Sequence, residues 1–436
     1  MHVPPILVRR PRLWVARRGG PWAAWDISSR PRRPRKEIPW HKTYSTIPTD
    51  AQYNVPTDFA STPLLHHSSH TCLSNQELPP HARSSSTRRM NLFQAVNDAL
   101  STALASDERV LLFGEDVAFG GVFRCSMNLA TQFGSERVFN TPLSEQGIVG
   151  FAIGCAAEGM KPVAEIQFAD YVYPAFDQLV NEAAKFRYRA GSTGHHAGGV
   201  VVRMPCGGVG HGALYVCDLG DRVFWSKWLM WIFLLANRYH SQSPEALFTH
   251  IPGLVVVMPR SPFQAKGLLL SAIESNDPVV FMEPKALYRA AVEQVPTEAY
   301  TLPLSKAEII KEGRDLTLIS YGNPLYTCSS AIAAAEKDLG ISIELVDLRT
   351  LYPWDRETIL GSVNKTGRAV VVHESMLNAG IGAEVAATIQ EGAFLKLEAP
   401  VQRVAGWGVH MGLVYEKFTI PDVTRIYDAI KKSIQY

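Results

Sequence analysis

Glu145 is the acidic residue whose sequence neighbours best suit it for chemistry. It lies in the segment 141–151, Thr-Pro-Leu-Ser-Glu-Gln-Gly-Ile-Val-Gly-Phe, at the expected start of an apolar, glycine-rich helix. A carboxyl group with few polar neighbours is poorly hydrated, so its proton affinity rises, and an acid that holds a proton near neutral pH can take part in catalysis. An acidic residue at a helix N-terminus also interacts favourably with the helix dipole. The spacing alone leaves both interpretations open.

The glycine-rich run 207–212, Gly-Gly-Val-Gly-His-Gly, is a weaker motif. It lacks the spacing of a dinucleotide-binding motif, and no acid follows it about 20 residues later at the end of a strand. We interpret it as a close backbone turn that carries His211. The six cysteines include no C-x-x-C pair, and we expect them to be small apolar residues in a reducing compartment.

The composition is typical of an ordinary globular protein with more than one domain. The chain has 436 residues, of which 46 % are hydrophobic and 19 % are charged, and this length favours two domains and a tail. The longest unbroken apolar run, Trp228–Ala236, is far shorter than the roughly 20 residues needed to cross a bilayer. We therefore expect no membrane-spanning helix and no membrane partner.

The first 36 residues are strongly basic. They contain nine Arg and one Lys but a single acid, Asp26, and Arg-rich, acid-poor N-termini are typical of organelle transit peptides. A nucleic-acid-binding arm is the competing interpretation, but such an arm usually has aromatic or Gly residues interleaved and a basic folded domain behind it. Residues 1–89 are rich in Pro, Ser, Arg and His and lack periodicity. We expect this whole stretch to be a disordered transit segment, with order beginning at Met90.

Beyond Met90, short apolar runs alternate with helical patterns, which predicts an α/β fold with parallel sheets covered on both faces. Two such sandwich domains are expected in series, over residues 90–295 and 305–436. The strands expected in the first domain span 110–113, 162–168, 199–203 and 253–258, with helices from Leu92 and over 177–188. Those expected in the second span 315–322, 341–348 and 369–373, with helices over 325–338, 354–363 and 382–391.

Several segments resemble one protein family. They are 114–124 (Gly-Glu-Asp-Val-Ala-Phe-Gly-Gly-Val-Phe-Arg), 138–151, 165–178 (Glu-Ile-Gln-Phe-Ala-Asp-Tyr-Val-Tyr-Pro-Ala-Phe-Asp-Gln), 259–266 (Pro-Arg-Ser-Pro-Phe-Gln-Ala-Lys) and 373–374 (His-Glu). Over residues 90–436 the chain is similar to beta subunits of the thiamine-diphosphate-dependent decarboxylating component of branched-chain 2-oxo acid dehydrogenase. The resemblance implies a transketolase-like pyrimidine-binding domain followed by a transketolase C-terminal-like domain. Pyruvate-specific relatives resemble the chain less, because they tend to read Ser-Glu-Met-Gly where residues 144–147 read Ser-Glu-Gln-Gly.

The resemblance gives Glu145 a catalytic role. In the family the matching Glu hydrogen-bonds a ring nitrogen of the cofactor's aminopyrimidine, where a shared proton favours the imino tautomer, and a solvated carboxylate of ordinary pKa would do this poorly. Gln167 and Tyr171 match positions that line the aminopyrimidine side of the pocket, and Leu143 and Glu115 match positions close to it. Tyr171 is also compatible with an aromatic residue that only packs between a strand and a helix.

The resemblance also implies a monovalent cation. Gly198 and Val200 match residues whose backbone carbonyls hold a structural K⁺ in some relatives. The chain differs from those relatives at the partner positions Ala272, Ser275 and Asp277. This chain therefore matches only part of the set of residues that hold the K⁺ ion in those relatives.

The chain lacks the motif that anchors the diphosphate in enzymes of this class. Mg²⁺ is held there by a Gly-Asp-Gly motif with a downstream Asn, and the nearest match here, 220–222, reads Gly-Asp-Arg. Without these hard oxygen ligands the chain supplies half of a site. The resemblance therefore implies an alpha subunit that holds Mg²⁺, an α2β2 heterotetramer, and a lipoyl-bearing dihydrolipoyl acyltransferase core as partners in the mitochondrial matrix. No nucleic-acid partner is expected.

One family motif is interrupted. Segments 210–215 and 240–246 are continuous in the family but are separated here by 24 residues, 216–239, which include three Trp. His240, which follows this insert, matches the family's catalytic histidine, which acts in the reductive acylation of the lipoyl group. Three interpretations are open: a translated intron or gene-model error, a lineage-specific loop that binds a partner, or an isoform in which the role of His240 is lost.

These features predict a subunit of an enzyme that decarboxylates branched-chain 2-oxo acids oxidatively and passes the acyl group to a lipoyl domain. Two alternatives remain open at the level of sequence. In the first alternative, the chain is the pyruvate-specific counterpart. In the second, it is a scaffold subunit whose catalysis is impaired by the insert 216–239.

Overall fold

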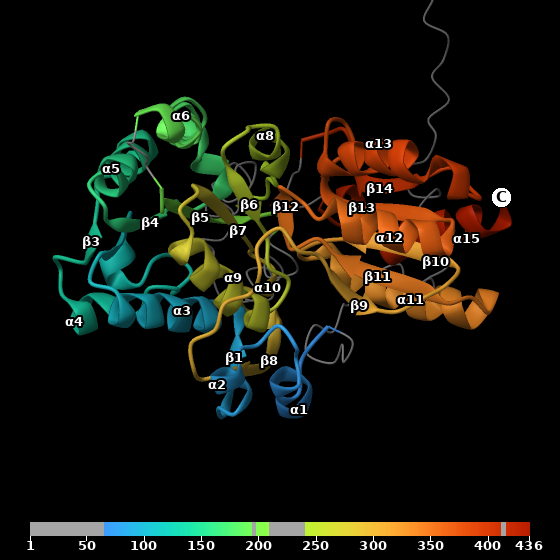
Figure 1. Cartoon of the computed structure of the whole chain (residues 1–436), viewed down its shortest axis with the longest axis horizontal. Coiled ribbons are helices and arrows are strands. Elements are labelled where there is room, and N and C mark those ends of the chain that lie inside the picture. The colour runs from blue at the N-terminus through green and yellow to red at the C-terminus, as the bar shows by residue number, and fades with distance from the viewer. Residues whose placement is uncertain (1–64, 194–197, 209–239, 411–415) are drawn as a thin grey trace, which may run out of the picture. The chain divides into compact units, whose positions relative to one another are not determined.

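The structure is a computed structural model that describes residues 65–193, 198–208, 240–410 and 416–436. Within these ranges two α/β sandwiches follow one another along the chain, each a largely parallel sheet between helices (Figure 1). The predicted fold class is therefore confirmed. None of the helices in these ranges combines the length and the apolar character needed to cross a membrane.

The first sheet has seven strands in the order β12-β6-β7-β5-β4-β2-β3. All neighbouring pairs are parallel except β12 and β6. Its strands are mostly apolar because both faces of the sheet are covered. Their bounds are β2 (Val110–Gly114), β3 (Val138–Asn140), β4 (Lys161–Glu165), β5 (Val201–Cys206), β6 (Val255–Val257), β7 (Val279–Pro284) and β12 (Thr350–Tyr352).

Each face of the first sheet is covered by its own helices, since alternate strand residues point to opposite faces. α3 (Leu92–Ser106) and α9 (Pro262–Glu274) share one apolar core with the sheet, and α5 (Glu145–Ala157) shares the other. The helix expected over 177–188 is a π-helical turn, Gln178–Ala183, that continues into α6 (Ala184–Thr193).

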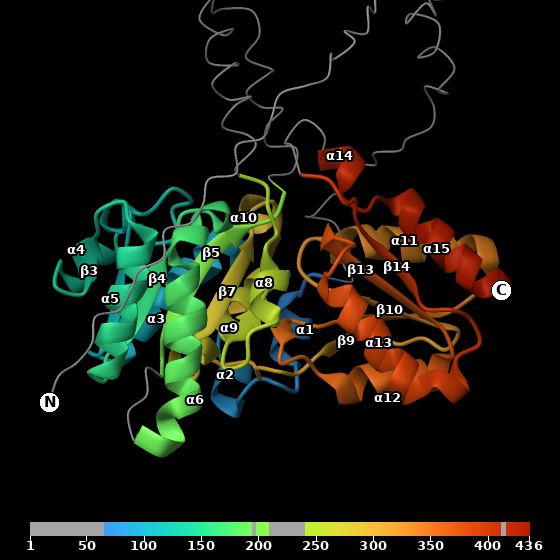
Figure 2. The ribbon, with the colours of Figure 1, turned by 90° about the horizontal axis from the view of Figure 1, so that it is seen from above.

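The second sheet has five strands in the order β14-β13-β10-β11-β9. β9 is antiparallel to β11, and the other pairs are parallel. α11 (Pro324–Leu339) and α15 (Val423–Gln435) cover one face, and α12 (Arg356–Thr366) and α13 (Ile381–Ala393) cover the other (Figure 2). The strands are β9 (Glu308–Lys311), β10 (Leu316–Ser320), β11 (Ile343–Asp347), β13 (Ala369–Met376) and β14 (Gln402–Gly406).

Shorter elements connect these layers. β1 (Thr87–Asn91) and β8 (Val292–Pro296) form a separate antiparallel ribbon. The short helices are α1 (Ser69–Leu73), α2 (Pro80–Arg83), α4 (Leu129–Phe133), α8 (Glu245–Thr249), α10 (Leu287–Ala290) and α14 (Glu416–Thr419). Four 3-10 turns, Val117–Phe119, Ala169–Tyr171, Tyr173–Ala175 and Phe394–Lys396, complete the described elements.

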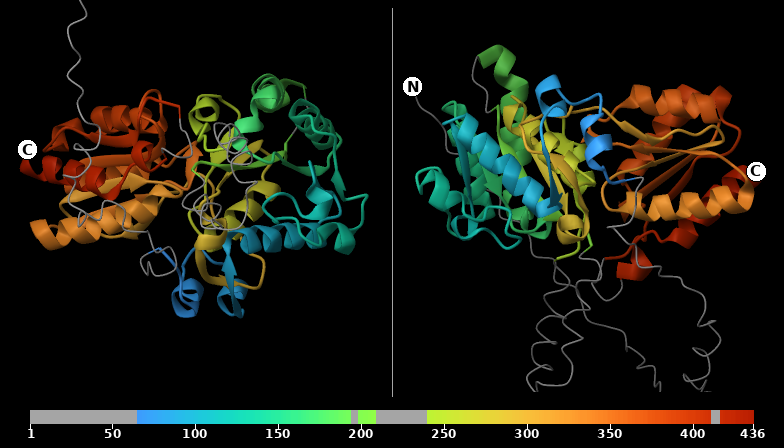
Figure 3. Two further views of the ribbon diagram at one scale, coloured as in Figure 1. Left: turned by 180° about the vertical axis from the view of Figure 1, so that it is seen from behind. Right: turned by 90° about the horizontal axis from the view of Figure 1, so that it is seen from below.

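Residues 65–91 form an ordered arm, which corrects the expectation that order begins at Met90. Leu65, Cys72, Leu78 and Ala82 are buried in the core, and α1, α2 and β1 belong to this arm (Figure 3). Helices of four and five residues bury one side chain each, so they leave no periodic stripe in the sequence. The remainder of the predicted transit segment, residues 1–64, lies outside the described residues.

Two polar side-chain contacts hold the arm to both domains. The two guanidinium nitrogens of Arg349 donate to the Glu77 carboxylate at 2.7 and 2.8 Å. His67 Nδ1 lies 2.9 Å from Glu293 on β8. These partners are separated from the arm by 272 and 226 residues of sequence.

Candidate active site

Glu145 occupies the first turn of α5, at the position that the sequence predicts. Ser144 is the N-cap residue, and its hydroxyl accepts a hydrogen bond from the Gly147 N–H at 3.4 Å. The inner face of α5 is buried in the core, whereas Glu145 is only partly buried in this chain. Leu143, just before the helix, is 71 % exposed. A carboxylate and an apolar side chain are therefore both presented at the beginning of this helix.

Glu115 and Tyr171 lie in the electrostatic field of Glu145. Glu115 directly follows β2, and its pKa is raised by burial and then by the negative charges of Asp116 and Glu145. The pKa of Tyr171 is raised by burial and then by Asp170, Glu115 and Glu145. The structure thus brings together three of the predicted site residues from the end of β2, the start of α5 and the turn after β4.

Gln167 shapes this region through contacts within the protein. Its side-chain amide donates to the backbone carbonyl of Glu115 at 2.6 Å and to the Glu165 carboxylate at 3.0 Å. Its carbonyl oxygen accepts the Val122 N–H at 3.1 Å. Because these bonds use both ends of the amide, Gln167 fixes the loops that carry Glu115 and Val122.

His240 lies against Tyr171, although the two are 69 residues apart in sequence. The Tyr171 hydroxyl is 2.9 Å from His240 Nε2. The Phe168 ring meets the imidazole edge-to-face, with 4.5 Å between ring centroids. The structure therefore brings His240 to the predicted site, while the preceding residues 209–239 lie outside the described part of the chain.

The segment that follows His240 is fixed from four directions. The Gln242 carbonyl accepts the Gly207 N–H at 2.8 Å, and the Gln242 side chain accepts the Tyr173 hydroxyl at 2.8 Å. Ser241 donates to Glu416 of the second domain at 2.7 Å. The Gln242 N–H donates to Asp170 at 3.2 Å. The position of His240 is thus determined by both domains.

Gly198 and Val200 lie at the other end of β5, where that strand begins. Both are buried, and the Val200 carbonyl accepts the Val279 N–H at 2.8 Å. Gly199 between them has φ +81°, and a Cβ there would lie 3.6 Å from the Ser275 carbonyl oxygen. In the described ranges, no group of three or more His, Cys, Asp or Glu side chains is arranged to hold a metal ion.

A buried charge cluster behind the site was missed by sequence reasoning. Arg203 on β5 is ion-paired with Glu165 on β4 and with Glu283 on β7, the latter at 2.8 Å. Tyr288 donates to Glu283 at 2.5 Å. The available signal was Arg203 inside the otherwise apolar β5, with an acidic residue at or near the end of β4 and of β7.

Three carboxylates from both domains meet near the His240 segment: Glu245, Glu374 and Glu416. Glu374 on β13 accepts the Gly208 N–H, and Glu245 accepts the Tyr321 hydroxyl at 2.7 Å. Burial raises the pKa of Glu374 to about 7, and the charges of Glu416 and Glu245 add to this effect. Glu374 therefore holds its proton close to neutral pH.

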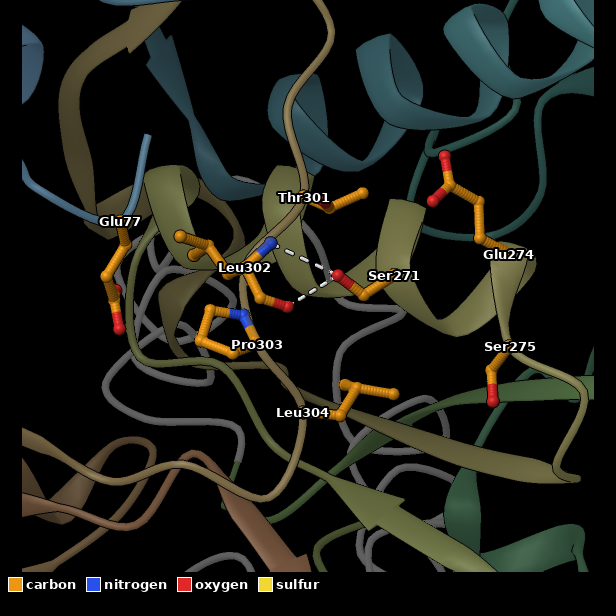
Figure 4. Close-up of a pocket in the computed structure, with 8 residues that line it drawn as sticks. All are labelled: Glu77, Ser271, Glu274, Ser275, Thr301, Leu302, Pro303 and Leu304. Carbon is orange, nitrogen blue, oxygen red and sulfur yellow. Dashed lines mark hydrogen bonds between the residues drawn. The ribbon is translucent and has the colours of Figure 1, made fainter. Parts of the chain in front are cut away.

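A hollow of about 610 Å³ elsewhere on the described surface is not this site. It is lined by Glu77, Ser271, Glu274, Ser275, Thr301, Leu302, Pro303 and Leu304 (Figure 4). The Ser271 hydroxyl bonds to the backbone of Leu302, and Glu77 is paired with Arg349. None of the predicted site residues lines this hollow.

The residues around Glu145 fit one part of the implied cofactor. A partly exposed carboxylate, a phenol and exposed apolar side chains suit an aromatic ring that bears ring nitrogens. Among the described residues, no group of three or more acidic, His or Cys side chains is placed to hold the Mg²⁺ of a magnesium diphosphate. This lining agrees with the prediction that the chain contributes the pyrimidine side of a thiamine site.

The fold and this half-site define a transketolase-type chain. The family model of the transketolase pyrimidine-binding domain matches residues 88–214 and 236–291, and that of the transketolase C-terminal domain matches residues 305–426. A solved structure of a split-gene transketolase, an inactive beta4 tetramer, has a TM-score of 0.58 at 19 % identity over 79 % of this chain and 98 % of that chain. At this identity the structure shows the fold alone.

Two relatives define the family more closely. The mitochondrial 2-oxoisovalerate dehydrogenase subunit beta of Chaetomium thermophilum is 66 % identical over 88 % of this chain and 77 % of the relative. The mitochondrial subunit beta 2 of Arabidopsis thaliana is 53 % identical over 81 % of this chain and 91 % of the relative. The chain belongs to the family of 2-oxoisovalerate dehydrogenase beta subunits, and the resemblance inferred from its motifs is confirmed.

Proposed function

We propose that this chain, with an alpha subunit, decarboxylates branched-chain 2-oxo acids oxidatively and passes the acyl group to a lipoyl domain. The observation that carries the proposal is the convergence of Glu145, Tyr171 and His240 at one edge of the first sheet, in a chain of this family. The names of the relatives favour branched-chain 2-oxo acids over pyruvate as substrates.

Glu145 is the residue that we assign to the cofactor's aminopyrimidine. Thiamine diphosphate, when bound, supplies the carbon nucleophile and the electron sink for decarboxylation. From the first turn of α5, the Glu145 carboxyl group would hydrogen-bond a ring nitrogen of the bound cofactor. Leu143, Glu115 and Tyr171 line this side of the site, and Gln167 fixes the loop of Glu115.

His240 is assigned to proton transfer in the later step, when the acyl group moves to the lipoyl sulfur. Its Nε2 and the Tyr171 hydroxyl form one hydrogen bond, in which the imidazole tautomer decides which of the two groups donates. The ring is oriented by Phe168 and by the bonds of Ser241 and Gln242. A histidine fixed in this way can deliver a proton without moving its backbone.

The remaining parts of the assembly are inferred from the family. An alpha subunit supplies the Mg²⁺ ligands in an α2β2 heterotetramer, and a lipoyl-bearing acyltransferase core accepts the acyl group. The relatives named above are mitochondrial proteins, and we place this chain in the mitochondrial matrix. Residues 1–64 contain the transit peptide, and Gly198 and Val200 offer carbonyls for a K⁺ ion.

The role of Glu145 is tested by Glu145→Gln in the complex with the alpha subunit. We expect CO₂ release from 3-methyl-2-oxobutanoate to fall by about 100-fold or more, because the amide cannot exchange a proton with the ring nitrogen. Glu158→Gln, at the exposed C-cap of the same helix, is the matched control and keeps normal turnover. Normal turnover of the Glu145→Gln complex would show that the assignment is wrong.

A further inference from the structure

One buried carboxylate, Asp170, joins the Tyr171 turn to the His240 segment. Asp170 is 5 % exposed, and its Oδ1 accepts the Gln242 N–H at 3.2 Å. Its Oδ2 has no hydrogen-bond partner among the described residues and lies 3.9 Å from the Lys285 Nζ. The carboxylate therefore faces a peptide two residues beyond His240 on one side and an ammonium group on the other.

Lys285 directly follows β7, and its ammonium group is buried beside the aromatic residues of the site. Its side chain is 1 % exposed, and its Nζ makes no hydrogen bond within the described ranges. The Nζ lies 5.6 Å from the centroid of the Phe168 ring, which itself contacts His240 edge-to-face. A buried ammonium that lies over an aromatic ring is stabilised by that ring.

The titratable groups that face Lys285 come from four elements. They are Asp170 in the Ala169–Tyr171 turn, Cys206 on β5, Glu374 on β13 and Glu416 on α14. Within the described residues, Asp170 alone has its carboxylate within 4 Å of the Nζ. A buried charge needs a counter-charge. Lys285, which follows β7, therefore holds the Asp170 carboxylate in place, and Asp170 in turn holds the Gln242 peptide.

We propose that Asp170 and Lys285 are positioning residues for acyl transfer: the pair fixes the Gln242 peptide and the Phe168 ring, and thereby aims His240 Nε2 at the Tyr171 hydroxyl. The proposal rests on the function proposed above for His240. A buried ion pair contributes little net stability by itself. The proposed role of this pair lies instead in the geometry of one catalytic step.

A second Lys–Asp pair, formed by the buried Lys266 and the partly exposed Asp98, provides a control. The Lys266 Nζ lies 2.7 Å from the Asp98 carboxylate and also donates to the Pro296 carbonyl at 2.8 Å. Asp98 lies on α3 and Lys266 on α9, and none of the predicted site residues contacts this pair in the described structure. Neutralising either member removes one charge from a buried lysine and its carboxylate partner without touching the His240 segment.

The test compares two rates in one preparation of the complex formed with the alpha subunit. CO₂ release is measured with an artificial electron acceptor, and acyl transfer is measured with an isolated lipoyl domain. In Asp170→Asn and in Lys285→Met we expect the ratio of acyl transfer to CO₂ release to fall at least tenfold. Asp98→Asn and Lys266→Met keep the wild-type ratio.

The double variant Asp170→Asn/Lys285→Met separates positioning from misfolding. Neither charge is then left buried alone, and the amide oxygen introduced at position 170 still accepts the Gln242 N–H, so the ratio recovers to within threefold of wild type. A wild-type ratio in either single variant, or a double variant no better than the single variants, overturns the proposal. Should the single variants fail to assemble, Asp170→Glu, which keeps the charge but displaces the carboxylate, is measured instead: a ratio at least tenfold below wild type supports the proposal, and a wild-type ratio overturns it. A wild-type complex without CO₂ release would instead refute the proposed function.

Discussion

Glu374 offers a stability measurement whose sign and size follow from its burial. Its ordinary pKa of 4.5 rises to about 7 in the folded chain, because burial and the charges of Glu416 and Glu245 disfavour the carboxylate. Below pH 4.5 the group is protonated whether the chain is folded or unfolded, so it has no effect on stability. Between pH 4.5 and 7 only the unfolded chain loses the proton, which favours unfolding, and above pH 7 the full penalty applies.

The magnitude of this penalty is about 3 kcal/mol, since each pKa unit corresponds to about 1.4 kcal/mol. Glu374→Gln removes it, because an amide does not ionise. The Gln carbonyl can still accept the Gly208 N–H, and the new amide N–H group would face carboxylates rather than add to their repulsion. We therefore expect the variant to equal or fall below wild type at pH 5 and to gain about 3 kcal/mol relative to it by pH 8.

Urea unfolding of the purified chain at pH 5, 6, 7 and 8 measures this difference. Glu391→Gln, on the exposed face of α13, is the control and should leave the pH dependence unchanged. A difference between Glu374→Gln and wild type that stays constant across this pH range would refute the electrostatic explanation.

Three further results are expected. Deleting residues 216–239 leaves seven residues, 209–215, to join Gly208 to His240, and the Gly207–Gln242 hydrogen bond of 2.8 Å shows that these ends are adjacent. The variant should therefore fold, and the shorter connection should raise its free energy of unfolding by roughly 1 kcal/mol. It should transfer acyl groups at least as fast as the full-length chain. Glu77→Ala leaves the buried Arg349 guanidinium without its carboxylate and should cost about 2 kcal/mol, seen as a lower Tm. The complex should release CO₂ faster from 3-methyl-2-oxobutanoate than from pyruvate, measured side by side; the reverse order would favour the pyruvate-specific alternative.

Local patterns in the sequence predicted part of the fold. The strands expected over 315–322, 341–348 and 369–373 correspond to β10, β11 and β13. Glu145 was predicted at the start of a helix from its flanking residues alone, and α5 begins there. Seven of the described strands were not predicted: β1, β3, β7, β8, β9, β12 and β14. In β12 the three residues, Thr350–Tyr352, are too few to show an alternation.

Contacts between distant segments could not be predicted in this way. Arg203 meets Glu165 because the register of β4 and β5 places the two residues side by side, and a sequence does not reveal a register. The bond between Tyr171 and His240 requires the positions of Gly207 and Asp170 as well. The arm was predicted to be disordered because its apolar residues, such as Leu65 and Leu78, are buried only by contacts with distant parts of the folded chain.

The arm also sets an order on folding. Its partners Glu293, Tyr326 and Arg349 are synthesised more than 200 residues after His66 and Glu77. Contacts over such separations form late, since closing long loops is slow compared with forming local structure. Strands β2 to β7 of the first sheet can therefore pair while Leu65 and Leu78 are still accessible to a chaperone. The arm can complete its docking only when Arg349 has reached the position in which it pairs with Glu77.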